Sequence, residues 1–256
     1  MAKKTQKRRI LITNDDGYFS DGIEVLFKEL STTDNVVMVA PDREQSASSH
    51  SLTLSRPLRM HQLDKNRYFT DGTPTDCILL ALQIALKNRV PDFIVSGINH
   101  GANMGDDVIY SGTVAAAVEG AILKIPSIAV SMVDHKPGMP MLRAARFVHK
   151  LLDAYDTFDF GPGTLLNVNL PPDNGKPYNR YQFTRQGNRV YKDMVIRKND
   201  PRGRDYYWIG GHPKWRRIKG SDFVAVQKGL VSLTPMGLEF TDFDILQRLT
   251  ECPVKI

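Results

Sequence analysis

The sequence predicts an α/β fold, a three-layer α/β/α sandwich around a Rossmann-like, mostly parallel sheet, with a C-terminal β-hairpin arm. Two observations predict it. Short apolar, strand-like runs alternate with helix-like segments up to about residue 170. After residues 171–175, which read Pro-Pro-Asp-Asn-Gly, glycine, arginine and aromatic residues dominate short segments. The first pattern is typical of right-handed βαβ units and the second of β hairpins.

The elements follow one another at regular spacing. The apolar run at residues 10–12 and the β-branched run at 35–42 lie about 25 residues apart, with a helical pattern at 23–30 between them, which suits a βαβ unit. Residues 51–54 alternate apolar and hydroxyl side chains, which predicts a half-exposed strand. The helix expected at 77–86 is apolar almost all round and should be buried. Further strands are expected at 91–99, 125–131 and 225–235, and a further helix at 113–120.

Composition narrows the class of protein. The chain has 256 residues, 41% of them hydrophobic, which is ample for a buried core. No apolar run approaches the roughly 20 residues that span a bilayer, and the basic N-terminus has no apolar stretch behind it. We therefore expect a cytoplasmic protein with no membrane partner. Cys77 and Cys252 lack metal-ligand spacing, so both are expected to be reduced thiols, with Cys77 in the core.

Positive charge is concentrated in two segments. Residues 1–9 carry five Lys or Arg residues, and residues 176–220 carry thirteen against three Asp, so the rest of the chain is net acidic. Eight Tyr, Phe and Trp residues accompany the second basic segment. Such a segment could be a subunit-contacting β arm or a surface for nucleic acid, and the absence of an RNA-binding sequence pattern favours the subunit contact.

These observations divide the chain into four parts. Residues 1–9 are expected to be a basic disordered tail, residues 10–175 the α/β catalytic core, and residues 176–220 a β-rich arm. Residues 221–256 are expected to return to the core as a strand and then form a C-terminal tail.

The first strand ends in Asn14-Asp15-Asp16-Gly17. Ligands bind at the carboxyl ends of the strands in open α/β sheets, so this segment is a candidate active-site edge. Adjacent carboxylates repel each other, and a cation or strong hydrogen bonds would be needed to keep both ionised. Taken alone, the segment could equally be a turn that caps the following helix.

Three further polar loops are expected at the same edge, at Ser46–His50, Ser96–Asp107 and Ser111–Thr113. Their side chains are almost all oxygen donors, which suits Mg²⁺, Mn²⁺ or Ca²⁺ better than zinc. Ser111-Gly112-Thr113 precedes a helix, where hydroxyls and backbone N–H groups can bind a phosphate, although these residues also simply start helices well.

The loops also contain His50 and His100, either of which is a candidate general acid. A surface or structural role is the simpler interpretation of both. The chain has no Gly-x-Ser-x-Gly elbow, no Gly-x-Gly-x-x-Gly fingerprint and no P-loop motif. Nucleophilic serine chemistry and dinucleotide binding are therefore disfavoured.

Five ordered motifs resemble those of the SurE survival-protein family of 5′/3′-nucleotidases. They are ILITNDDG, VAPDREQSASSHSLTL, GTPTDC, VSGINHGANMGDDVIYSGTVAAA and VSLTP. The resemblance is dense over about residues 9–132 and looser at the C-terminal strand. It implies a metal-dependent phosphatase acting on nucleoside 5′- and 3′-monophosphates, with exopolyphosphatase activity in some members.

The resemblance also implies residue roles. One divalent ion per subunit, Mg²⁺ or Mn²⁺ with Ca²⁺ as a crystallisation occupant, would be held by Asp15, Asp16, Ser46 and Asn99. Phosphate contacts would fall on Asn103, Ser111, Gly112 and Thr113. Family members are homodimers or homotetramers that exchange the arm, which supports the subunit-contact interpretation of residues 176–220.

The resulting hypothesis is hydrolysis of a nucleotide phosphomonoester, with Asp15, Asp16 and Asn103 as the catalytic residues. The metal would activate the attacking water, and no protein nucleophile is needed. A covalent phosphoryl group on Asp16 is the mechanistic variant. A nucleotide- or RNA-binding module that uses the basic aromatic arm is the alternative function.

Overall fold

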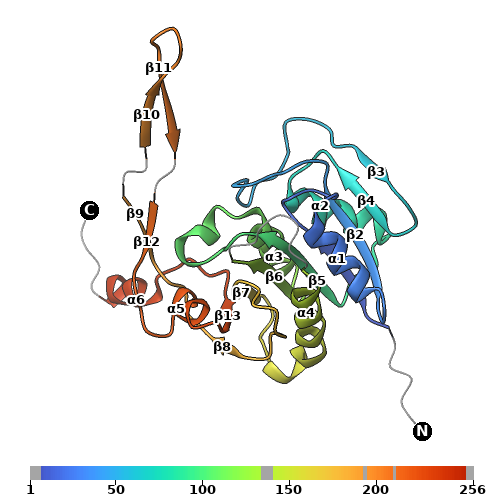
Figure 1. Cartoon of the computed structure of the whole chain (residues 1–256). Helices are drawn as coiled ribbons and strands as arrows, with labels where there is room; N and C mark the ends of the chain where they lie inside the picture. The colour runs from blue at the N-terminus through green and yellow to red at the C-terminus, as the bar shows by residue number, and fades with distance from the viewer. Residues whose placement is uncertain (1–6, 134–140, 193–194, 210–211, 252–256) are drawn as a thin grey trace.

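The computed structural model describes residues 7–133, 141–192, 195–209 and 212–251. Its centre is a nine-stranded sheet with helices on both faces, and a slender hairpin, β10–β11, projects from the body (Figure 1). The sheet is mostly parallel, and the α/β sandwich with an arm that the sequence predicts is confirmed. The predictions for Cys252, for residues 1–6 of the basic tail and for residues 252–256 of the C-terminal tail concern residues outside the described part of the chain.

The strands of the main sheet lie in the order β3-β4-β2-β1-β5-β6-β7-β13-β8. Their bounds are β1 Arg9–Thr13, β2 Asn35–Pro41, β3 Met60–Gln62, β4 Arg67–Thr70, β5 Phe93–His100, β6 Ser127–Met132, β7 Leu165–Leu170, β8 Tyr181–Phe183 and β13 Val231–Met236. β3 runs antiparallel to β4, and β13 runs antiparallel to β7. The six strands from β4 to β7 are parallel neighbours.

Alternate residues of β1 face the two helical layers. Ile10 and Ile12 belong to the core cluster that includes α1 (Asp21–Leu30) and α4 (Leu142–Ala154). Leu11 belongs to a second cluster with Cys77 of α2 (Pro74–Leu80) and Ala116 of α3 (Gly112–Ile122). Because side chains alternate across a strand, an apolar run of three residues is buried on both faces.

The remaining helices lie in the C-terminal half or in short turns. α5 covers Asp222–Gln227 and α6 covers Phe243–Glu251. Shorter helical turns are η1 (Ala81–Ala85), η2 (Gly105–Ile109) and η3 (Tyr155–Phe158). α2 begins with a capping box in which Thr73 and Asp76 each bind the other's backbone N–H.

The structure corrects three local expectations. Residues 51–54 form no strand, and Leu54 is 88% exposed, so the apolar alternation there is not matched by burial. The helix expected at 77–86 is buried in its first half only, because the chain continues as η1 and leaves Ile84 exposed. The strand expected at 225–235 begins only at Val231, since residues before it form α5.

The start of the chain and the arm depart from the expected boundaries. Arg8 pairs with Asp34 and Asp153, and β1 begins at Arg9. The folded core therefore includes Arg8 and Arg9, which were expected to belong to the tail. β8, within the expected arm, joins the main sheet beside β13. The projecting part consists of β9 (Arg189–Lys192) paired with β12 (His212–Trp215), and β10 (Val195–Asn199) paired with β11 (Asp205–Ile209).

Among the described residues, no helix is long and apolar enough to cross a membrane. The cytoplasmic location stays a prediction.

Candidate active site

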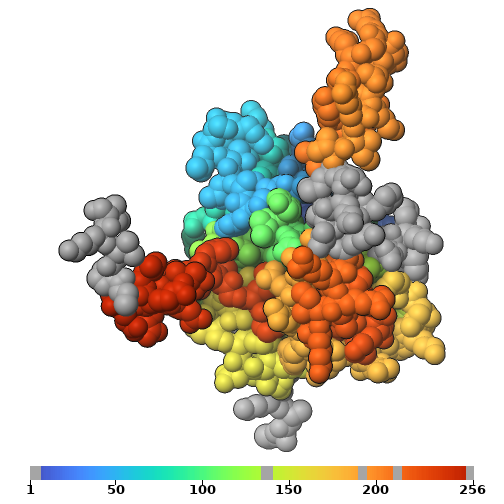
Figure 2. Space-filling model, turned by 90° about the vertical axis from the view of Figure 1, so that its left-hand side faces the viewer, coloured from blue at the N-terminus to red at the C-terminus, as the bar shows by residue number. Residues whose placement is uncertain are grey.

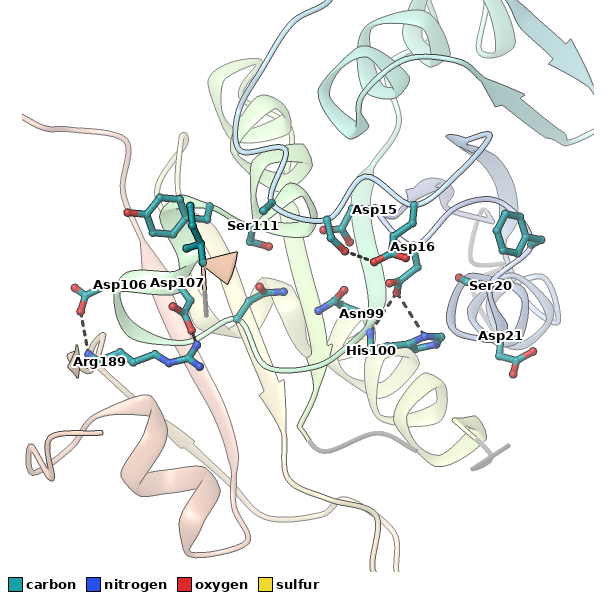
Figure 3. A pocket seen from close by; sticks show the side chains of 17 residues that line it. Asp15, Asp16, Ser20, Asp21, Asn99, His100, Asp106, Asp107, Ser111 and Arg189 are labelled. Atoms are coloured by element: carbon teal, nitrogen blue, oxygen red, sulfur yellow. Dashed lines mark hydrogen bonds and ion pairs between the residues drawn. The ribbon is translucent and has the colours of Figure 1, made fainter. Parts of the chain in front are cut away.

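A cleft of about 1270 Å³ lies at the carboxyl ends of the parallel strands (Figure 3). β1 and β5 are neighbours in the sheet, and the chain leaves them toward opposite edges, so their loops diverge at this point. The cleft is lined by Asp15, Asp16, Phe19, Ser20, Asp21, Glu44, Ser46, Ala47, Asn99, His100, Asn103, Asp106, Asp107, Tyr110, Ser111, Arg189 and Ile209. The topology therefore brings the predicted loops after β1, β2 and β5 to one place.

Asp15 is almost fully buried and is held by the start of α3. Its Oδ2 accepts the backbone N–H of Thr113 at 3.0 Å, and its Oδ1 accepts the Thr113 hydroxyl. Burial, followed by the nearby charge of Asp16, raises the pKa of Asp15 to about 6 despite these hydrogen bonds. The Asp15 carboxylate is thus fixed in direction and is costly to keep ionised, which favours a nearby cation.

Asp16 lies beside Asp15 and is more accessible. Its Oδ2 accepts the backbone N–H of His100 at 3.2 Å and lies 3.9 Å from the imidazole Nδ1. Burial and the charge of Glu44 raise the pKa of Asp16 above its usual value. The pKa values of the two adjacent carboxylates are therefore raised together, in each case chiefly by burial.

Ser46 reaches the same cleft from the loop after β2, and Asn99 reaches it from the carboxyl end of β5. The Asn99 amide nitrogen donates to the carbonyl of Gly101 at 3.0 Å, which leaves the amide oxygen as the acceptor atom of this side chain. Ser46 is exposed, and its hydroxyl donates to Glu44 at 2.6 Å, so the hydroxyl oxygen retains acceptor capacity. Both residues offer oxygen ligands of the kind that the sequence predicts.

Asn103 is fixed at both its backbone and its side chain. Its N–H donates to Asn169, its carbonyl accepts from Asn167 and Asn169, and its amide nitrogen donates to Ser131 at 2.8 Å. The backbone of Asn103 is thereby bound to β7, and its side chain is bound to β6. Ser111 also lines the cleft and caps α3 by accepting the N–H of Val114.

Other predicted residues lie outside the cleft lining. Gly112 and Thr113 are buried behind it, and Thr113 directs both of its donors at Asp15. A Cβ on Gly112 would lie 2.9 Å from the Asp15 Cβ, so the position has no room for a side chain. His50 pairs with Glu119 at 2.8 Å, whereas His100 lines the cleft. Burial lowers the pKa of His100 below its usual value, against the opposing effect of nearby carboxylates.

Sequence reasoning assigned no role to several cleft residues. They are Phe19, Asp21, Glu44, Asp106, Asp107, Tyr110, Arg189 and Ile209. Asp106-Asp107 repeats the paired carboxylates of the first loop, a signal that was available in the sequence. Arg189 and Ile209 come from the arm, and only the tertiary structure brings them to the cleft (Figure 3).

The cleft has a strongly acidic lining. Six carboxylates line it, against the single arginine Arg189, in the part of the chain that the structure describes. Arg189 is itself paired with Asp107. An anionic phosphate ester entering this cleft would be repelled unless a cation entered with it.

The donor chemistry fits a hard divalent cation. Within the described ranges, no three His, Cys, Asp or Glu side chains converge as a metal site. A cation bound by Asp15 and Asp16 would therefore depend on neutral oxygen donors, and Ser46 and Asn99 supply them at the same cleft.

Comparison with known proteins agrees with this geometry. The family model described as "Survival protein SurE" matches residues 10–193. The chain is 46% identical to a 5′-nucleotidase SurE of Gemmatimonas aurantiaca over 252 residues, covering 95% of this chain and 98% of that protein. It is also 46% identical to a 5′-nucleotidase SurE of Myxococcus xanthus over 250 residues, covering 95% and 92% respectively.

A solved structure shares the fold. The crystal structure of the SurE protein from Aquifex aeolicus matches with a TM-score of 0.82 and 38% sequence identity, covering 95% of this chain and 98% of that one. The family model, the relatives and the shared fold together establish that this chain belongs to the SurE family.

Proposed function

We propose that this chain is a metal-dependent phosphomonoesterase that hydrolyses nucleoside 5′-monophosphates to nucleoside and phosphate. The 5′-nucleotidase activity rests on membership of a family whose relatives, at 46% identity over almost the whole chain, carry that name. Action on 3′-monophosphates and on short polyphosphates is part of the proposal. The acidic cleft supports metal dependence, because its six carboxylates would otherwise repel any phosphate ester.

Asp15, Asp16, Ser46 and Asn99 are the residues that would hold one Mg²⁺ or Mn²⁺ ion. The bound ion would polarise a phosphoryl oxygen and lower the pKa of an adjacent water molecule. Thr113 orients Asp15 through two hydrogen bonds, and the backbone of His100 orients Asp16. These contacts fix both carboxylates before substrate arrives, which favours catalysis because little reorganisation remains.

Asn103, Ser111 and the start of α3 would bind the remaining phosphate oxygens. Asn103 is held toward β6 and β7 by hydrogen bonds with Asn167, Asn169 and Ser131. Ser111 lies at the N-terminus of α3, an 11-residue helix whose dipole favours negative charge there. In this structure Thr113 supports Asp15, and its contact with phosphate stays a prediction.

Attack by water is the proposed route, with no protein nucleophile. His100 lines the cleft beside Asp16, and its position supports a role in proton transfer to the leaving oxygen. His50 is engaged with Glu119 and is the weaker candidate. Trapping a phosphoryl group on Asp16 would contradict water attack and favour the covalent variant.

We also propose that the protein is a homodimer or homotetramer in which the arm contacts a second copy. The hairpin β10–β11 projects from the body and carries exposed apolar residues such as Trp208 at 62% and Ile209 at 84% (Figure 2). α6 has no buried residue and also stands away from the core (Figure 2). Such surfaces are typical of subunit contacts.

The arm gives less support to RNA binding. Several of its arginines are neutralised within the chain, since Arg197 pairs with Asp205 and Arg204 pairs with Asp200. Nucleic-acid binding depends on free positive charge that replaces phosphate counterions.

A turnover assay tests the proposed function. Purified protein with Mn²⁺ or Mg²⁺ should release phosphate from a panel of nucleoside 5′- and 3′-monophosphates, and EDTA should stop the release. Asp15→Asn and Asp16→Asn should each lower kcat by at least about 100-fold, because the cation loses a charged ligand. Activity that survives EDTA, or that persists in both variants, would contradict metal-dependent hydrolysis.

A further inference from the structure

A single buried carboxylate, Asp222, joins the loop that follows Asn103 to the base of the arm, which is the segment of residues 187–189 that leads into β9. Asp222 is fully buried. Its Oδ2 accepts the backbone N–H of Gly105 at 2.8 Å, and its Oδ1 accepts the N–H groups of Gly187 at 2.9 Å and Phe223 at 2.7 Å. Three separate segments of the chain therefore meet at one side chain.

This arrangement is more than the capping of a helix. Of the three donors, only Phe223 belongs to α5, the helix that Asp222 starts. Gly105 lies 117 residues away in sequence and Gly187 lies 35 residues away. Because these two donors are distant in sequence, Asp222 stabilises a tertiary contact between three segments and does more than cap its own helix.

The packing around Asp222 leaves no room for the segments to shift independently. A Cβ on Gly105 would lie 3.1 Å from the backbone of Gly187 and 3.1 Å from the Trp215 ring. A Cβ on Gly187 would lie 2.6 Å from the Asp222 Oδ1. Gly105 also has a φ of +54°, which favours glycine on its own account.

The hydrogen bonds of Asn103 described above all go to β6 and β7. Its backbone is bound by Asn167 and Asn169 of β7, as described above. Gly105, two residues after Asn103, donates its backbone N–H to Asp222, which lies at the start of α5. The short segment that carries Asn103 into the cleft is therefore fixed at both ends.

The same loop continues into contacts with the arm. Asp106 Oδ2 accepts from the Asn188 amide and from the Arg189 N–H, both at 2.9 Å, and Asp107 pairs with the Arg189 guanidinium. Figure 3 shows Arg189 between these two carboxylates. The loop and the base of the arm thus form one unit, with Asp222 buried at its centre.

We propose that Asp222 is a positioning residue of the active site, which sets the placement of Asn103 by tying the loop after it to the base of the arm. The inference rests on the proposed contact between Asn103 and the substrate phosphate. Asp222 does not line the cleft and touches no reacting atom. Its effect on catalysis is indirect, through the position of Asn103.

The test is Asp222→Asn, which keeps the side-chain size and turns an N–H group toward donors that need an acceptor. We expect kcat for a nucleoside 5′-monophosphate to fall by about 10- to 100-fold, the scale of a misplacement of about 1 Å. KM should change by less than about threefold, since most phosphate and metal contacts remain. Circular dichroism at the assay temperature should show that the variant is folded.

A double-mutant cycle separates positioning from general loss of structure. In an Asn103→Ala background, Asp222→Asn should lower kcat by less than about threefold, because the group that it positions is gone. Gly187→Ala serves as a second route if Asp222→Asn does not fold, since its Cβ would push the Asp222 carboxylate away. It should give the same selective loss of kcat.

Asp173→Asn is the matched control. The Asp173 side chain is 1% exposed, pairs with Arg143 and accepts the Gly175 N–H, and it does not line the cleft. It should lower thermal stability and leave kcat unchanged.

The outcomes distinguish this inference from the proposed function. If Asn103→Ala lowers kcat while Asp222→Asn and Gly187→Ala do not, positioning by Asp222 is wrong and the proposed function stands. Equal falls in kcat from Asp222→Asn with and without Asn103 would also overturn it. If Asn103→Ala has no effect on kcat, the proposed role of Asn103 fails first.

Discussion

At the scale of single residues, the site depends on Thr113, which orients the buried Asp15. Both of its oxygens accept from Thr113, one from the backbone and one from the hydroxyl. A carboxylate with a pKa raised to about 6 by burial is expensive to keep charged, and each hydrogen bond offsets part of that cost. Thr113 is therefore expected to contribute to activity through its hold on Asp15.

Thr113→Val should weaken metal activation. The change removes the hydroxyl donor to Asp15 with little change in volume, and a hydrogen bond to a charged group contributes about 1.5–3 kcal/mol. We expect the metal concentration for half-maximal activity to rise by about tenfold or more. A metal titration of phosphate release measures it.

Thr70→Val is the control for this change. Thr70 is also fully buried, but its hydroxyl has no hydrogen-bond partner among the described residues. The same substitution there should leave the metal titration unchanged and should not lower stability. An equal shift in both variants would mean that the effect of Thr113→Val is not specific to Asp15.

At the scale of elements, α1 lies unusually close to β5. A Cβ on Gly22 of α1 would overlap the carbonyl oxygen of Ile98 in β5. The close approach lets α1 pack Ile23, Leu26 and Leu30 into the core. It also sets the start of α1 next to the loops that carry Asp16 and His100.

Gly22→Ala should destabilise the fold by about 1–3 kcal/mol or more, because the backbone of β5 or the whole helix must move. Thermal unfolding measures the loss. Gly161→Ala is the matched control, since no atom lies within 4 Å of its added Cβ. A neutral result for Gly22→Ala would show that α1 can shift at little cost.

The start of β1 is tied to the turn after α1 by a pH-dependent ion pair. Burial raises the pKa of Asp34, but the Arg8 side chain donates to it at 2.8 Å and the net pKa is lowered below 3.8. A lowered folded-state pKa contributes stability above the unfolded value that is lost as pH falls through the folded value. Asp34 should therefore stabilise the fold at neutral pH and cease to do so in acid.

Asp34→Asn should lower the free energy of unfolding at pH 7 by about 1.5–3 kcal/mol. The difference from the unaltered protein should shrink as the pH falls below about 4. Denaturant unfolding at several pH values checks it. Asp153→Asn removes the more exposed partner of the same arginine, at 61% side-chain exposure, and should cost less than about 1 kcal/mol. A difference for Asp34→Asn that persists to pH 2 would argue against the ion pair as its source.

At the scale of the whole molecule, the arm has two roles in one segment. Arg189, at the start of β9, lines the cleft, whereas Tyr207 and Trp208 of β11 are more than half exposed on the hairpin that projects from the body (Figure 1). Among the described residues, little of the chain covers these aromatic side chains.

Replacing both Tyr207 and Trp208 by serine should shift the protein toward smaller species in light scattering coupled to size exclusion. Both are more than half exposed, so the thermal stability of the single chain should not fall. Lys198→Ser on the paired strand is the control and should leave the mass unchanged. An unchanged mass in the double variant would place the subunit contact elsewhere.

The order of strands and helices could be predicted from the sequence, because hydrophobic period and turn residues act over short distances. Residues 51–54 show the limit. Their alternation resembles that of a strand, yet their backbone bonds to side chains at the start of α2, since the Thr53 N–H donates to Asp76 and the Ser51 carbonyl accepts from the Thr73 hydroxyl. The sequence pattern did not predict the short strands β3 and β4, because runs of three and four residues are too short to show a clear period; β3 is the edge strand, and β4 is half-buried beside it.

The sequence by itself determined the sheet and the loops that meet at its carboxyl edge, including Asp15, Asp16, Ser46 and Asn99. These four residues lie in one cleft because parallel βαβ units leave little choice of where a loop can lie, and their role as metal ligands stays a prediction. Only the tertiary structure decided that Thr113 orients Asp15, that Arg189 reaches the cleft, and that Asp222 binds Gly105. Each of these contacts joins segments tens of residues apart through one side chain, and such pairings leave no periodic trace in the sequence.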